Sequence, residues 1–197
     1  MLKEVYHASR KQGVKVIRPR RSTHGRTWVY ATKDPVVAAC FLGNLGGDFT
    51  CAIGRDPDSK MPFICERFAG AFNVRYGGVS GSIYVLPGRG FAEGMTGWDE
   101  EVVSSEPAAP LRETRVADAA DYLRGLERDG KLRIVLYPEK IAGIPEDDED
   151  LVRRAVIWSR RFGPAGVLRE LGKYHPQLVK RAKEALKAGE YSGEGAL

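Results

Sequence analysis

The stretch Thr27–Leu42, TWVYATKDPVVAACFL, changes its hydrophobic periodicity in the middle. Its first six residues are rich in strand formers, whereas Asp34 followed by proline is a helix-start signal that precedes an apolar run. We therefore predict a strand that contains Tyr30 and a helix, over Asp34–Leu42, that carries Phe41. Two rings that converge from separate elements can form a slot for a flat ligand.

Further short apolar runs, bounded by turn residues, predict more strands on both sides of this stretch. The run VYHAS predicts a strand that carries His7 near its end. Few helical patterns separate the strands that follow, so an antiparallel arrangement is favoured over alternating β-α-β units. The later runs that predict strands are Phe49–Ile53, Met61–Phe68, Ser82–Leu86, Glu101–Ser105 and Leu132–Tyr137.

Four features in this order resemble the diphtheria-toxin-like ADP-ribosyltransferases, the His-Tyr-Glu group that includes the poly(ADP-ribose) polymerases. They are His7 in YHAS, Tyr30 in VYAT, Phe41 after it, and the acidic strand start at Glu100 and Glu101. The resemblance covers roughly residues 3 to 110. It implies an enzyme that uses NAD as a substrate, with an antiparallel-strand-rich α+β core.

The resemblance assigns the catalytic carboxylate to Glu101, with Glu100 and Glu106 as alternatives because a small error in strand register exchanges them. A carboxylate beneath the departing ribose stabilises an oxocarbenium-like transition state, in which positive charge develops. Relatives that modify arginine usually carry Glu or Gln two residues before the catalytic Glu. Asp99 occupies that position here, which argues against an arginine acceptor.

The resemblance also implies the residues that bind NAD. His7 would contact ribose hydroxyls, and Ala8 stands where the family usually has a glycine whose backbone holds the nicotinamide amide. Tyr30 and Phe41 would sandwich the nicotinamide ring. Arg20 would meet the pyrophosphate, because a guanidinium fork matches phosphate geometry. Weaker candidates for that last role are Arg18, Arg21 and Arg26.

Composition narrows the remaining classes of function. Hydrophobic residues make up 43% and charged residues 29% of the 197 residues, which is ordinary for a soluble globular protein. No apolar run approaches the roughly 20 residues of a membrane span, and the first residues do not read as a signal peptide, so we expect a cytoplasmic protein without membrane contact. Cys40, Cys51 and Cys65 lack the spacing of a zinc site or of a disulfide framework, so no metal is assigned.

The formal net charge of +5 is unevenly distributed. Basic residues gather near both ends of the chain, whereas residues 93 to 150 are acidic. The periodicity predicts a helix over Arg115–Asp129 and then, after the acidic run, helices over Glu149–Phe162, Pro164–Gly172 and Pro176–Ala188. We therefore divide the chain into an ADP-ribosyltransferase-like domain, residues 1–138, and a basic helical extension, residues 139–197.

The leading hypothesis is a mono-ADP-ribosyltransferase that cleaves NAD at the nicotinamide-ribose bond and transfers ADP-ribose to a protein or nucleic-acid acceptor. An NAD glycohydrolase and a tRNA 2′-phosphotransferase-like enzyme are alternatives on the same fold. An inactive module of this fold that binds nucleic acid or a partner is an alternative from another class. The basic C-terminal helices could contact RNA or DNA, although runs of charge are more often solvated helix faces.

Overall fold

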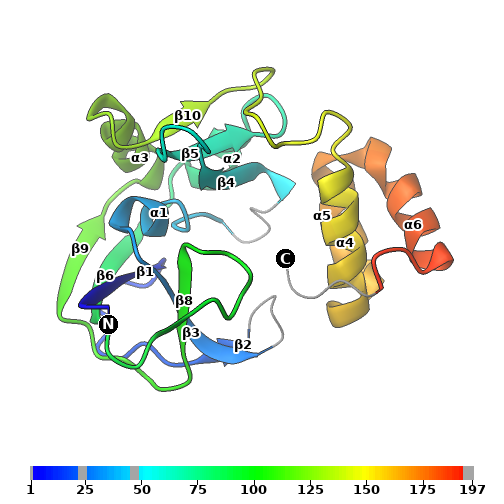
Figure 1. The fold of residues 1–197 in the computed structure, drawn as a ribbon. Helices are drawn as coiled ribbons and strands as arrows, with labels where there is room; N and C mark the ends of the chain where they lie inside the picture. The colour runs from blue at the N-terminus through cyan, green and yellow to red at the C-terminus, as the bar shows by residue number, and fades with distance from the viewer. Residues whose placement is uncertain (1, 22–25, 45–48, 193–197) are drawn as a thin grey trace.

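A computed structural model describes residues 2–21, 26–44 and 49–192, and two β-sheets dominate it (Figure 1). The larger sheet has seven strands, in the order β7-β8-β3-β1-β6-β9, with β2 paired to β3. All of its pairings are antiparallel. Its strands are β1 (Glu4–Ser9), β2 (Arg20–Arg21), β3 (Thr27–Thr32), β6 (Gly81–Pro87), β7 (Ala92–Glu93), β8 (Glu101–Ser104) and β9 (Arg112–Val116).

The smaller sheet has the order β10-β5-β4. Strands β4 (Cys51–Arg55) and β5 (Pro62–Glu66) form an antiparallel hairpin, and β10 (Arg133–Val135) is parallel to β5. The fold is therefore α+β with mostly antiparallel sheets, as the sequence predicts. The parallel pairing of β10 with β5 was not predicted. Several strands and helices separate these two strands in the sequence, and local sequence patterns do not show which distant strands pair.

Three helices pack with the two sheets around one main core. They are α1 (Pro35–Ala39), α2 (Ala71–Tyr76) and α3 (Ala119–Arg128). Buried side chains of Ile83 on β6, Cys51 on β4 and Ile64 on β5 belong to this core, which links both sheets to the helices. Burial of apolar area of this kind is the main force that holds the sheets together.

Helix α1 begins where the sequence predicts, because the Asp34 side chain accepts a hydrogen bond from the Val36 amide at 2.7 Å. The helix is shorter than predicted and ends at Ala39. The amides of Phe41 and Leu42 bond carbonyls three residues back, which tightens the last turn. The Tyr76 hydroxyl donates to the Cys40 carbonyl at 2.8 Å. Phe41 therefore lies in the turn after the helix, not on the helix.

The prediction of a helix from Arg115 was wrong at its start. Residues Arg115 and Val116 belong to β9, where they pair with β6. The Asp118 side chain caps α3 by accepting a hydrogen bond from the Asp121 amide at 2.9 Å. The apolar residues before this cap extended the helical pattern in the sequence, although the cap itself marks the true boundary.

Three C-terminal helices follow the two sheets. They are α4 (Glu149–Phe162), α5 (Pro164–Tyr174) and, after the 3₁₀ turn η2 (Pro176–Leu178), α6 (Val179–Ala188). The bounds of α4 are those that the sequence predicts, whereas α5 continues two residues further. No helix within the described residues is both long and apolar enough to cross a membrane.

The C-terminal helices pack around their own core, which also contains Phe49 from the segment before β4. The buried His175 side chain makes a 2.6 Å hydrogen bond from Nε2 to the Phe49 carbonyl oxygen. The buried Arg67 guanidinium, next to β5, contacts the carboxylates of Asp148 and Asp150 at the start of α4. These contacts fix α4 against the end of the smaller sheet (Figure 1).

Candidate functional site

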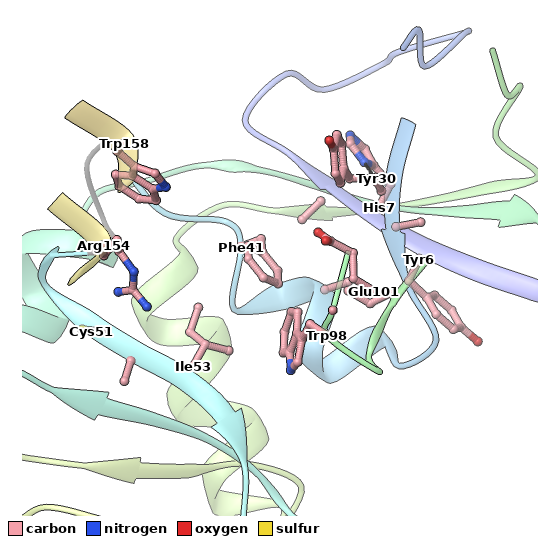
Figure 2. Close-up of a pocket in the computed structure, with 16 residues that line it drawn as sticks. Tyr6, His7, Tyr30, Phe41, Cys51, Ile53, Trp98, Glu101, Arg154 and Trp158 are labelled. Atoms are coloured by element: carbon pink, nitrogen blue, oxygen red, sulfur yellow. Dashed lines mark hydrogen bonds between the residues drawn. The ribbon is translucent and has the colours of Figure 1, made fainter. Parts of the chain in front are cut away.

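A pocket of about 610 Å³ lies between strands β1, β3 and β8 of the larger sheet, the turn after α1, β4 and α4. Its volume is in the range of small-molecule binding sites. Figure 2 shows the residues that line it. Sixteen residues line the pocket: Tyr6, His7, Ala8, Tyr30, Ala31, Thr32, Ala38, Phe41, Cys51, Ala52, Ile53, Gly97, Trp98, Glu101, Arg154 and Trp158.

The pocket contains five of the six site residues that the sequence analysis selected. His7 and Ala8 come from β1, Tyr30 from β3, Phe41 from the turn after α1 and Glu101 from the start of β8. Strands β1, β3 and β8 are neighbours in the sheet, so residues that are far apart in the sequence meet at one place.

The strand register explains why Tyr30 and Glu101 share a face. Thr32 pairs with Glu101, and Tyr30 pairs with Val103, two residues further along β8. Side chains two positions apart on a strand point to the same side, and paired residues do so as well. The Tyr30 ring and the Glu101 carboxylate therefore project from the same side of the sheet into the pocket, as Figure 2 shows.

His7 is held in one tautomer by its partner. Its Nδ1 lies 2.6 Å from the Tyr30 carbonyl oxygen, and a carbonyl can only accept a hydrogen bond, so Nδ1 carries the proton. Burial lowers the pKa of His7, the bond to the Tyr30 carbonyl partly opposes this effect, and the positive charge of Arg20 lowers the pKa further. The ring is consequently neutral near pH 7, and Nε2 is left as a hydrogen-bond acceptor.

The aromatic residues of the pocket, apart from His7, come from five separate segments of the chain. Phe41 is 41% exposed, and it packs edge-on against Trp98 at 5.8 Å between ring centroids. The Trp98 carbonyl accepts a hydrogen bond from the Glu101 amide at 3.1 Å. Trp98 therefore connects the Phe41 ring to the residue that begins β8.

The structure separates the three candidate glutamates. Only Glu101 lines the pocket. Glu100 forms a bidentate ion pair with Arg55, at 2.6 and 2.9 Å. Glu106 lies beyond the end of β8 with an exposed side chain, and its amide and carbonyl are bonded to Ser104. Asp99 is also exposed and does not line the pocket.

Arg55 connects two segments that shape the pocket. Besides Glu100, it bonds the Asp34 carboxylate at 2.6 Å, and Asp34 is the residue that caps α1. The hydrogen bonds to Glu100 and then to Asp34 raise the pKa of Arg55, so it is charged at every working pH. One guanidinium thus ties the start of α1, which leads to Phe41, to the residue directly before Glu101.

Arg20 is the selected residue that does not line the pocket. It lies in β2 with an exposed side chain and pairs with Trp28 on β3. Its charge nevertheless reaches the site, because it contributes to the lowered pKa of His7. Among the weaker candidates, Arg26 packs its guanidinium over the Trp28 ring, and its carbonyl accepts a 3.3 Å hydrogen bond from the Tyr30 hydroxyl.

Sequence reasoning missed several large side chains of the pocket, and three of them come from outside the strands. Trp98 comes from the loop before β8, whereas Arg154 and Trp158 come from α4. The latter two are spaced by four residues, so they lie on the same face of the helix, and the Arg154 guanidinium lies 6.0 Å from the Trp158 ring centroid. This spacing was visible in the sequence, but nothing in it indicated that this face of α4 turns toward the strands.

The pocket also contains Cys51, whose chemistry is limited by burial. Burial raises the pKa of the Cys51 thiol to about 12, so the thiol is protonated at neutral pH and is a poor nucleophile. No cluster of three or more possible metal ligands occurs in the part of the chain that the structure describes.

Comparisons of the chain with protein-family models, with curated proteins and with solved structures found no match.

Proposed function

We propose that this protein is an ADP-ribosyltransferase of the diphtheria-toxin-like type, which cleaves NAD at the nicotinamide-ribose bond and transfers ADP-ribose to a protein or nucleic-acid acceptor. The observation that supports this most is the composition of one pocket. His7, Tyr30, Phe41 and Glu101, selected from the sequence in that order, all line it, and the two competing glutamates do not.

The pocket residues fit an N-glycoside with a flat leaving group. Tyr30 and Phe41 would hold the nicotinamide ring, which limits its orientation relative to the ribose. His7 would accept a hydrogen bond from a ribose hydroxyl through Nε2, since its Nδ1 proton is committed to the Tyr30 carbonyl. This role needs a neutral ring, and the lowered pKa of His7 supplies one.

Glu101 would act at the reacting bond. When the bond between C1′ and nicotinamide breaks, its electron pair leaves with the nicotinamide nitrogen, and positive charge develops on the ribosyl group. The carboxylate of Glu101 would stabilise that charge and bond the 2′-hydroxyl. The acceptor then attacks C1′ and loses a proton as the new glycosidic bond forms.

The test is nicotinamide release from NAD, measured together with incorporation of label from NAD into a cell lysate. We expect Glu101→Gln to lose activity by about 10²- to 10³-fold, because a preorganised charge partner is removed. Glu106→Gln is the matched control and should remain fully active. Thermal unfolding of both variants verifies that the fold persists.

Two results would contradict the proposal in different ways. Full activity of Glu101→Gln would show that the reaction does not need the Glu101 carboxylate. Nicotinamide release by the wild type without label on any macromolecule would favour an NAD glycohydrolase, in which water is the acceptor. Digestion of a labelled product with nuclease or protease identifies the class of acceptor.

A further inference from the structure

The side of the pocket formed by α4 carries different functional groups from the side formed by β1, β3 and β8. Figure 2 shows Arg154 and Trp158 on one side of the pocket, with Phe41 between them and the group formed by Tyr30, His7 and Glu101. The strand side therefore presents a carboxylate and the α4 side a guanidinium. Such a polarity would favour the anionic part of an asymmetric ligand near Arg154 and disfavour it near Glu101.

Trp158 is a suitable platform for a flat ring. It is half-buried, and its ring packs edge-on against Phe49 with centroids 5.6 Å apart. Phe49 is itself buried and is bonded through its carbonyl to His175. The indole is thus held in place by its contact with Phe49 while it still lines the pocket. A ring that is already fixed loses little conformational entropy when it binds a partner.

The geometry points to a nucleotide subsite on α4, in which Trp158 stacks on a base and Arg154 binds the attached phosphate. Indole rings stack on any base, and a guanidinium matches phosphate oxygens in a bidentate manner. This subsite deepens the proposed function and rests on it for the choice of ligand. It also provides a cation inside the pocket, a position that Arg20 does not occupy.

The nucleotide could come from two sources that share this chemistry. One is the ADP half of NAD, whose nicotinamide half would then lie between Tyr30 and Phe41. The other is a nucleotide of a nucleic-acid acceptor. Both present a base attached to phosphate, so separate binding measurements must distinguish them.

The experiment is titration calorimetry with NAD, ADP, nicotinamide and a short single-stranded oligonucleotide, each tested alone. We expect Arg154→Gln to weaken binding of one phosphate-containing ligand by about 10- to 100-fold, which is typical for loss of charged hydrogen bonds. Trp158→Ala should produce a similar loss, and Trp158→Phe should restore most of the affinity because a ring remains. Nicotinamide binding should be unchanged in all three variants.

Arg169→Gln is the matched control, since it removes an exposed arginine from α5 outside the pocket. A loss confined to ADP and NAD assigns the subsite to the dinucleotide, and a loss confined to the oligonucleotide assigns it to the acceptor. Arg154→Gln and Trp158→Ala proteins that fold and bind every ligand with wild-type affinity would overturn the inference. ADP binding that depends on Arg154, in a protein that never releases nicotinamide, would instead retain the subsite and refute the transferase.

Discussion

Replacing Arg55 by glutamine should destabilise the protein and displace Glu101 at the same time. Arg55 makes charged hydrogen bonds at 2.6 and 2.9 Å to Glu100 and at 2.6 Å to Asp34. The side chains of Arg55, Asp34 and Glu100 are 26%, 25% and 15% exposed, so the cluster lies between a surface ion pair and a buried one.

The magnitude follows from this intermediate burial. Exposed pairs contribute about 0–1 kcal/mol, whereas removal of one partner of a buried pair costs about 3–5 kcal/mol. We therefore expect Arg55→Gln to lower the free energy of unfolding by about 2 kcal/mol. For a chain of this size, that loss shifts the Tm by about 4–8 °C. Nicotinamide release should fall by about tenfold or more, because Glu100 no longer fixes its neighbour.

The assays are thermal and urea unfolding, together with nicotinamide release. Lys33→Gln is the control, since it breaks the more exposed Lys33–Glu93 pair and should change stability by less than about 0.5 kcal/mol. The double variant Arg55→Gln with Glu100→Gln should recover part of the lost stability, because it removes one of two carboxylates left without a counter-ion. Equal Tm shifts in Arg55→Gln and Lys33→Gln would refute the reasoning.

Two further predictions concern the aromatic slot and the basic helices. Tyr30→Ala should weaken NAD binding, measured by calorimetry, about tenfold more than Tyr30→Phe does, because the ring and not the hydroxyl forms the slot; equal losses would reveal a specific role for the hydroxyl. Lys180→Glu with Lys183→Glu should leave transfer to RNA, DNA and protein unchanged, since neither residue lines the pocket and the Lys180 side chain is 89% exposed. Loss of transfer to nucleic acid alone, with NAD hydrolysis intact, would assign α6 to acceptor binding.

Local signals in the sequence were sufficient to predict most of the secondary structure. Asp34-Pro35 correctly marks the start of α1, and the periodicity of residues 149 to 162 gives α4 its observed bounds. The short helix α2 was missed because it spans only six residues between glycines, so its apolar residues show too little periodicity. Its position is set by the tertiary contacts of Phe72 and Tyr76 in the main core.

The strand side of the pocket could be inferred from the sequence and the α4 side could not. His7, Tyr30 and Glu101 were selected because their short motifs resemble those of a known family, and the structure places these motifs in neighbouring strands. The position of α4 depends on long-range contacts, namely Arg67 with two aspartates and His175 with the Phe49 carbonyl. Periodicity shows which face of a helix is apolar, but it does not show what that face meets.

The two walls of the pocket are encoded in separate parts of the chain. The carboxylate, the histidine and the aromatic slot come from residues before 105, whereas Arg154 and Trp158 come from a helix that is anchored through its own buried contacts. Substitutions on the side of this helix that lines the pocket can therefore change one wall of the pocket while the strand framework stays intact. A homologue with different C-terminal helices would keep the strand side of the pocket, with its proposed reaction centre, and combine it with a different opposite wall.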